Sequence, residues 1–359
     1  MMTQMSRLEV RKDNLGESRL VTGTAPALKE GEILVRVERF ALTANNVTYG
    51  VVGEKIGYWK FFPAEEGWGV IPVWGFAEIV ESQTEGLGPG DRLYGYFPMG
   101  THLVMTPVKV SAERLIDGAP HRAELPPVYN SYSRAGVATP LDDARALLFP
   151  LYATSFCLYD FLIDNDWFGA AQAVLVSASS KTAIGLAIAL HDDERGPAPV
   201  ALTSPRNLQF VKDLGLYDAA FTYEEISAID NSKPTVVVDF SGNGETLSDL
   251  HRHLGDNMRF CSNVGVTHYE KNAMGPHFIH ERSQMFFAPG HIKKRAGEWG
   301  PGAFEQKAFG FWKDAAEKRS GWLKIEHAKG MNDCEDVFHE LRKGGTAPDR
   351  GLIVEPWTS

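Results

Sequence analysis

The fold is decided by the segment Val174-Leu-Val-Ser-Ala-Ser-Ser-Lys-Thr-Ala-Ile-Gly-Leu-Ala-Ile-Ala-Leu190. It predicts a buried strand over 174–176, a tight turn of small polar residues over 177–180, and an apolar helix that opens at Thr182. Such a unit can bind a nucleotide, because the free N–H groups of the first helical turn point at a phosphate. The turn is poor in glycine and Lys181 stands in it. From these residues alone, a phosphate site and an ordinary strand–helix crossover stay equally open.

The composition limits the classes of function that this chain can have. A chain of 359 residues has room for two domains, and its net charge of −10 argues against a nucleic-acid partner, which needs a clustered basic surface. We expect no membrane span, because no apolar run approaches the roughly 20 residues that a span needs. The polar start Met1–Asn14 lacks the apolar core of a signal peptide, so we expect a cytoplasmic protein.

Cysteine and histidine usage predicts no metal site. The chain has three scattered cysteines, Cys157, Cys261 and Cys334, which suit neither a disulfide framework nor a C-x-x-C zinc site. Cys157 and Cys261 stand in apolar contexts and are expected to be buried. His251 and His253 are the closest pair of interest, and an exposed helix face explains them better than a metal does.

The order of the expected elements indicates two domains. The first third has β signals and Gly/Pro turns, followed by a Pro-rich stretch over 114–140 that we interpret as a long loop. From Asp142 the pattern is helical, with one helix starting there and a second over about 154–163. Apolar strands and helices then alternate, which predicts a parallel sheet covered on both faces. The expected strands lie at 32–38, 74–81, 174–176, 200–203, 235–240, 258–264 and 351–356, and a late helix at 333–343.

Several segments in this order resemble the medium-chain dehydrogenase/reductase superfamily, in its zinc-independent quinone and enoyl reductase-like branch. They are Leu87-Gly-Pro-Gly-Asp-Arg-Leu-Tyr-Gly95, Leu151-Tyr-Ala-Thr-Ser-Phe-Cys-Leu158, Val237-Val-Asp-Phe-Ser-Gly-Asn-Gly-Glu-Thr-Leu247, the strand from Phe260 to Gly265, and the ending 334–354. The resemblance implies an α/β protein with a GroES-like β-rich catalytic domain (1–150 and 291–359). It also implies a Rossmann-type, doubly wound parallel-sheet domain (151–290).

One departure from the zinc-dependent relatives shapes the expected reaction. Their G-H-E motif is replaced by Trp74-Gly75-Phe76-Ala-Glu, without histidine, and the cysteine ligands are missing. Without a metal to stabilise an alkoxide, we expect reduction of a conjugated C=C bond (enone or enoyl thioester) or of a quinone. A zinc-free carbonyl reductase and a non-catalytic NADPH-binding sensor remain alternatives.

The expected cofactor is NADPH. The second strand of the nucleotide unit ends without the Asp or Glu that binds the ribose of NAD, and carries a serine, an arginine and an asparagine instead, which suit a 2′-phosphate. Lys181 either contacts a phosphate or points into solvent. The full set of expected cofactor-binding residues is Thr154, Ser179, Ser180, Lys181, Thr182, Ser204, Arg206, Asn207, Tyr223, Ser241, Gly242 and Gly265.

The resemblance also implies an Asn and a Tyr near the substrate. Asn45, Tyr49 and Tyr58 are the candidates, with Asn46 a neighbouring alternative. A tyrosine can supply a proton without being ionised beforehand. The aromatic residues after Met285, among them Phe304 and Trp312, either line a pocket for a flat apolar substrate or belong to the core or a dimer interface. We expect a homodimer, as in relatives.

Overall fold

The protein is represented by a computed structural model that describes residues 3–264 and 274–358. The chain divides into two compact units. The first comprises Met1–Leu147 and Leu323–Ser359, and the second comprises Leu148–Trp322. We describe each unit by itself.

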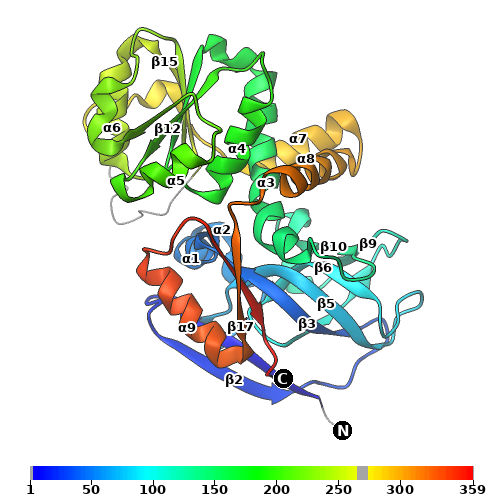
Figure 1. Ribbon diagram of the computed structural model, residues 1–359. Coiled ribbons are helices and arrows are strands. Elements are labelled where there is room, and N and C mark those ends of the chain that lie inside the picture. The colour runs from blue at the N-terminus through cyan, green and yellow to red at the C-terminus, as the bar shows by residue number, and fades with distance from the viewer. Residues whose placement is uncertain (1–2, 265–273, 359) are drawn as a thin grey trace. The chain divides into compact units, whose positions relative to one another are not determined.

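The first unit is built on mostly antiparallel strands (Figure 1). A small sheet has the order β2-β1-β4, and a larger one has the order β17-β18-β3-β5-β6-β10-β9-β8, with β7 paired to β3. Its strands are β1 Gln4–Arg11, β2 Ser18–Thr24, β3 Ile33–Leu42, β4 Trp68–Gly69, β5 Pro72–Ser82, β6 Arg92–Pro98, β7 His102–Met105, β8 Pro107–Val108, β9 Arg114–Asp117, β10 Ser131–Arg134, β17 Lys324–Lys329 and β18 Arg350–Glu355. Its own helices are α1 Ala44–Val51, α2 Gly53–Ile56 and α9 Gly330–Lys343.

The expected loop over 114–140 is wrong in part, because two strands and two short 3-10 helices are ordered there. Buried polar contacts hold this stretch. The Arg122 guanidinium forms an ion pair with Asp117 at 2.8 Å and donates to the Tyr132 hydroxyl at 3.0 Å. That hydroxyl in turn donates to the Tyr96 carbonyl at 2.5 Å. A buried charge persists when it is paired and hydrogen-bonded in this way, so the stretch belongs to the interior of the unit.

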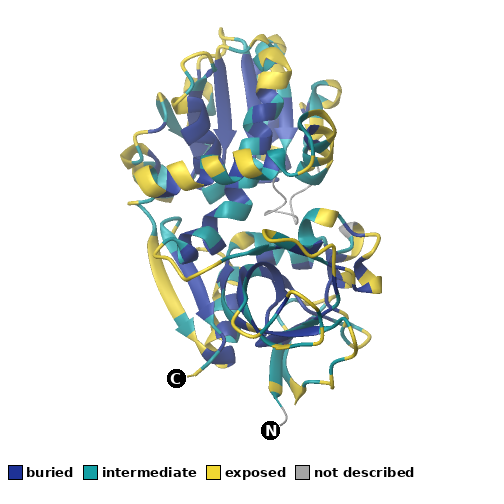
Figure 2. Ribbon diagram, turned by 90° about the vertical axis from the view of Figure 1, so that its right-hand side faces the viewer, coloured by how far each residue is buried: buried dark blue, intermediate teal, exposed yellow. Residues whose placement is uncertain are grey.

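The second unit contains a six-stranded parallel sheet with the order β13-β12-β11-β14-β15-β16. Its central strands β11, β12 and β14 are buried, as Figure 2 shows, because helices cover both faces. The order reverses at β11, which is the point where open α/β sheets bind ligands at the carboxyl ends of their strands. The strands are β11 Gln172–Val176, β12 Ala198–Thr203, β13 Ala219–Thr222, β14 Thr235–Asp239, β15 Met258–Asn263 and β16 Ser283–Met285. The helices are α4 Lys181–His191, α5 Leu208–Asp213, α6 Gly244–Leu254, α7 Ala288–Trp299 and α8 Ala303–Arg319.

A single helix, α3 (Asp142–Asp164), replaces the two helices expected between 142 and 163. It continues through Pro150, which removes one backbone donor without ending the helix. By length and composition α3 is apolar enough to cross a membrane, so the expectation that no such run exists is wrong. Half of its most apolar window is buried inside the protein, as in the core helix of a folded domain.

Helices α7 and α8 belong to the second unit, so the chain returns to the first unit at Leu323 instead of the expected 291. The reason is aromatic packing against α3. Phe304 lies with its ring centroid 5.5 Å from that of Phe156, and Trp312 lies 5.8 Å from Phe149. Both Phe304 and Trp312 are buried, which favours the core alternative for these two residues.

The three cysteines are free and buried, as expected of Cys157 and Cys261. The expectation of an exposed helix face fails for His251, which is fully buried and whose Nδ1 accepts from the Ile279 backbone N–H at 3.0 Å. His253 binds the Ile229 carbonyl at 2.8 Å. In the part of the chain that the structure describes, no three His, Cys, Asp or Glu side chains are grouped as metal ligands would be.

Candidate functional site

The turn after β11 is stabilised by its own side chains. Ser177 adopts a left-handed conformation with φ of 63°, which a glycine would adopt at less cost. The Ser180 side chain caps α4 by accepting from the Ala183 N–H at 3.2 Å. The Ser179 hydroxyl accepts from the Asn207 amide at 2.9 Å. Hydrogen bonds to these hydroxyl groups thus fix one backbone path in the turn. A glycine-rich loop relies on the conformational freedom of glycine instead.

Helix α4 begins at Lys181, one residue earlier than expected, with its N-terminus at the carboxyl edge of the sheet. The Lys181 ammonium lies 6.0 Å from the Trp322 ring centroid, within cation–π range. The Thr182 carbonyl accepts from the Ser155 hydroxyl at 2.7 Å. Thr154, an expected cofactor contact, donates to the Pro150 carbonyl of its own helix at 3.3 Å. Ser155 and Tyr152 of α3 both lie against Gly185 of α4.

The end of β12 offers a place for an anionic group. The Ser204 hydroxyl is buried and has no hydrogen-bond partner among the residues described. Arg206 is exposed two residues later, in a 3-10 turn that leads into α5. A buried hydroxyl without a partner is costly, which makes it a good candidate for a ligand contact. A hydroxyl and a guanidinium are both groups that bind phosphate oxygens.

The turn after β14 is organised by a buried carboxylate. Asp239 accepts from the Ser241 N–H at 2.8 Å, from the Ser241 hydroxyl at 2.6 Å and from the Gly242 N–H at 2.9 Å. Burial raises the pKa of Asp239, although these hydrogen bonds act in the opposite direction. Gly242 has a φ of 65°, which explains the glycine. The carboxylate thereby fixes two of the expected cofactor residues, and Gly265 lies outside the described residues.

Tyr223 begins the 3-10 helix that follows β13. Burial raises the pKa of its hydroxyl to about 12, partly offset by a hydrogen bond to Ser177. Tyr223, Ser177, Ser204 and Ser241 all follow parallel strands of one sheet. Because the carboxyl ends of parallel strands share an edge, these residues lie along that edge, with Ser177 and Ser241 at the reversal point of the sheet.

In the first unit, the three expected catalytic candidates lie together. Tyr49 on α1 and Tyr58 have ring centroids 4.5 Å apart, and Asn45 hydrogen-bonds to Tyr49. Burial raises the pKa of both tyrosines well above the ordinary value, so both hydroxyls are protonated at neutral pH. Asn46 is buried and bonds backbone groups, accepting from the Thr43 N–H at 2.8 Å and donating to the Pro72 carbonyl at 2.9 Å. Asn46 therefore has a structural role.

Sequence reasoning missed the other members of this aromatic cluster. The Tyr58 and Tyr129 hydroxyls lie 2.9 Å apart, and the Tyr96 ring centroid is 4.8 Å from that of Tyr129. The Tyr96 hydroxyl is buried and has no partner among the described residues. Trp74 lies 5.0 Å from Tyr96, centroid to centroid. Tyr129 lies in the stretch interpreted as a loop, where no periodic pattern signals its burial.

Comparison with solved structures supports this architecture over nearly the whole chain. CurA from Vibrio vulnificus, crystallised in complex with NADPH, matches with a TM-score of 0.67 at 12% identity, covering 99% of this chain and 100% of that chain. The CurK enoyl reductase matches with a TM-score of 0.61 at 14% identity, covering 98% and 99%. The quinone oxidoreductase from Coxiella burnetii matches with a TM-score of 0.55 at 16% identity, again covering 98% and 99%.

At these identities the likeness establishes the fold, and the expected α/β fold, with a GroES-like β-rich domain and a Rossmann-type parallel-sheet domain, is confirmed. Among curated proteins, none matches this sequence. A family described as "Protein of unknown function (DUF2855)" matches over residues 40–347. Since that match covers most of both units, the chain belongs to this family.

Proposed function

We propose that this protein is an NADPH-dependent, zinc-independent oxidoreductase that reduces an activated C=C bond, in an enone or an enoyl thioester, or a quinone. The proposal is supported by the fold, which the chain shares with a quinone oxidoreductase, the CurK enoyl reductase and CurA in complex with NADPH. The observation that carries the cofactor proposal is the buried, unpartnered Ser204 hydroxyl after β12, two residues before Arg206 in the chain.

The cofactor residues divide by role. Arg206 and the Ser204 hydroxyl would hold the 2′-phosphate, and the N-terminus of α4 with Lys181 and Thr182 would hold the pyrophosphate. Ser241 and Gly242 form the turn after β14, where they would contact the cofactor. Asp239 holds this turn in place by hydrogen bonds. Bound NADPH supplies a hydride to the electrophilic carbon of the substrate.

Cofactor choice is tested by titrating NADPH and NADH. Arg206→Ala removes a charge-assisted contact worth about 1.5–3 kcal/mol, so NADPH affinity should fall roughly 10- to 100-fold while NADH affinity stays unchanged. Arg259→Ala is the matched control, because Arg259 is exposed and lies on β15. Stronger binding of NADH by the wild type, or unchanged NADPH affinity in Arg206→Ala, would contradict the assignment.

The proton donor is proposed to be Tyr58 or Tyr49, with Asn45 holding a substrate oxygen. Burial keeps both hydroxyls protonated, as a donor requires. Replacing the true donor by phenylalanine should lower kcat by about 10²-fold or more in a stopped-flow assay of NADPH oxidation with enones and quinones. If both single variants keep the wild-type rate, neither Tyr49 nor Tyr58 is the proton donor.

The same substrate panel separates the alternatives. Consumption of the alkene supports the proposal, consumption of the enone carbonyl indicates a carbonyl reductase, and NADPH binding without turnover indicates a sensor. We also propose a cytoplasmic homodimer that acts on a flat, apolar small molecule. A solution mass of twice the 39.6 kDa of the chain would support the dimer, and a monomer mass would rule it out.

A further inference from the structure

A cavity lies within the second unit, apart from the candidate cofactor residues. Its volume is about 410 Å³, and it is formed by β15, β16, the end of α3 and the start of α7. This volume is in the usual range of small-molecule sites. None of the described cofactor candidates lines it. Phe161, Phe260, Phe286 and Phe287 form its apolar walls, and Ser262 and His291 are among its polar lining residues.

The aromatic walls favour a flat ligand. The ring centroid of Phe161 lies 5.8 Å from that of Phe260 and 5.5 Å from that of Phe286. Phe260 is stacked on Phe168 at 4.2 Å with the rings nearly parallel, so its position is fixed from behind. Phe287 is 49% exposed, although exposure of an aromatic side chain is unfavourable. An aromatic ligand would cover this apolar surface, and the rings of the cavity walls are already held in positions where they can pack against it.

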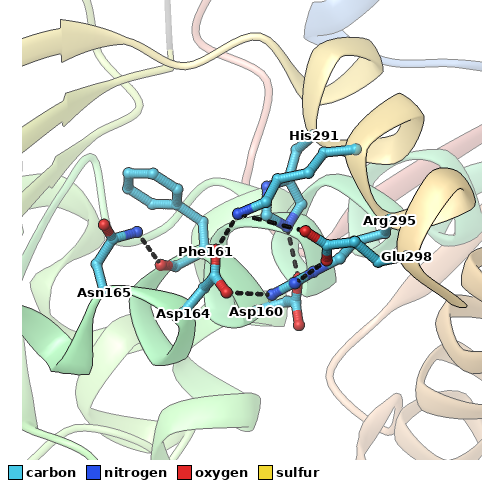
Figure 3. Close-up of polar contacts among 8 residues, drawn as sticks. Asp160, Phe161, Asp164, Asn165, His291, Arg295 and Glu298 are labelled. Atoms are coloured by element: carbon cyan, nitrogen blue, oxygen red, sulfur yellow. Dashed lines mark hydrogen bonds and ion pairs between the residues drawn. The ribbon is translucent and has the colours of Figure 1, made fainter.

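His291 is oriented by a buried carboxylate, as Figure 3 shows. Its Nε2 lies 2.5 Å from Asp160 Oδ2, which also accepts from Arg295 Nε at 2.5 Å. Burial tends to raise the pKa of Asp160, but the hydrogen bonds from His291 and Arg295 hold it below its ordinary value. The carboxylate is therefore only an acceptor, and Nε2 carries the hydrogen. In the neutral imidazole, Nδ1 is an acceptor, and it has no partner within the described ranges.

The charges around His291 disfavour an anionic ligand. Three carboxylates, Asp160, Asp164 and Glu298, stand against two cations, Lys294 and Arg295. Arg295 pairs with all three carboxylates, and Lys294 pairs with Asp164 and lies 3.9 Å from Glu298. With neutral imidazole the cluster keeps one excess negative charge. This excess disfavours an anionic ligand, and a ligand that meets the acceptor Nδ1 of the neutral imidazole would be a neutral hydrogen-bond donor.

We propose that this cavity is a second ligand site, which takes a flat, neutral aromatic molecule whose phenolic hydroxyl donates to His291 Nδ1. The Ser262 hydroxyl gives a second polar contact, because Ser262 is 1% exposed, lines the cavity and has no side-chain partner among the residues described. The site is independent of the proposed reductase activity, since it shares no residue with the cofactor candidates.

The test compares two probes of nearly equal shape, 2-naphthol and 2-methoxynaphthalene, by fluorescence titration of the full-length protein with and without NADPH. We expect one 2-naphthol per chain and roughly tenfold weaker binding of the methoxy compound, which lacks the donor. His291→Phe should abolish this difference. His191→Phe is the matched control, because His191 is exposed at the end of α4 and does not line the cavity.

Gly290→Leu provides a test that leaves the Asp160 contacts intact. Gly290 lines the cavity, and a Cβ there would meet only Phe287 Cδ1, at 4.0 Å. The larger side chain should occupy the cavity and abolish naphthol binding while the thermal unfolding temperature is kept. Absence of saturable binding, equal affinity for the two probes, displacement of naphthol by NADPH, or undiminished binding in Gly290→Leu would each overturn the proposal.

Discussion

Replacing Asp239 by alanine is expected to destabilise the second unit strongly. The carboxylate receives three hydrogen bonds from Ser241 and Gly242, and all three residues are buried. Each buried donor left without a partner costs about 1–3 kcal/mol. Removal of a desolvated charge offsets part of this loss, so we expect a decrease of about 3–6 kcal/mol in the free energy of unfolding.

Asp239→Asn separates hydrogen bonding from charge. The amide oxygen can still accept from the Ser241 N–H and hydroxyl, whereas the Gly242 N–H loses its acceptor. The expected loss is about 1–2 kcal/mol. Since burial raises the native pKa of Asp239, the wild-type group stabilises the fold most below its unfolded pKa, and this contribution is lost as pH rises through the native pKa. The Asn variant should lack that dependence.

Urea unfolding followed by circular dichroism measures these differences. Asp256→Ala is the matched control, because the Asp256 side chain is fully exposed and its change should stay within about 0.5 kcal/mol. The reasoning fails if Asp239→Ala lies within about 1 kcal/mol of the wild type, because then the three hydrogen bonds contribute almost nothing net.

Two further predictions concern packing and pH. In Gly185→Ala the new Cβ would lie 2.5 Å from Ser155 Oγ, and the overpacking should outweigh the helix propensity of alanine, lowering stability by about 1–2 kcal/mol in thermal unfolding. Gly310→Ala, whose Cβ would meet nothing within 4 Å, should instead stabilise α8; a Gly185 variant that behaves the same way would refute close packing. Burial lowers the pKa of His251 to about 4 in the folded protein, so as pH falls the unfolded protein binds a proton at this histidine before the folded protein does. Stability should therefore fall by roughly 3 kcal/mol as pH drops from 6.5 to 4, and His251→Phe should flatten that fall in urea titrations at several pH values. An unchanged slope would assign the loss to other groups.

The regular part of the second unit could be predicted because its pattern is local. The strands expected at 235–240 and 258–264 appear as β14 (Thr235–Asp239) and β15 (Met258–Asn263), and α6 begins at the expected Gly244. Continuous apolar runs between polar turns are typical of strands buried on both faces. The stretch 114–140 could not be predicted in this way, since its order depends on side-chain polar contacts, including one from Tyr132 to Tyr96, that leave no periodic pattern in the sequence.

The candidate sites were predictable only in part, for the same reason. The sequence places Ser179 in the turn after β11, but its partner Asn207 lies 28 residues further along. The Tyr58 hydroxyl meets that of Tyr129 across 71 residues. No local signal distinguishes a hydroxyl that is held inside the protein from one that faces a ligand. Only the folded chain shows that Ser180 is a helix cap and that Ser204 is without a partner.

The bonded turn at Ser177–Ser180 has a consequence for how ligand binding would respond to sequence change. A glycine-rich loop loses backbone entropy when its ligand orders it, whereas this turn loses that entropy during folding. Pre-organisation of this kind favours ligand affinity, but it couples that affinity to protein stability, whereas a glycine-rich loop keeps the two separate. A substitution of Ser179 or Ser180 would change protein stability and ligand affinity together. Binding defects in this turn are therefore interpretable only alongside the unfolding free energy of the same variant.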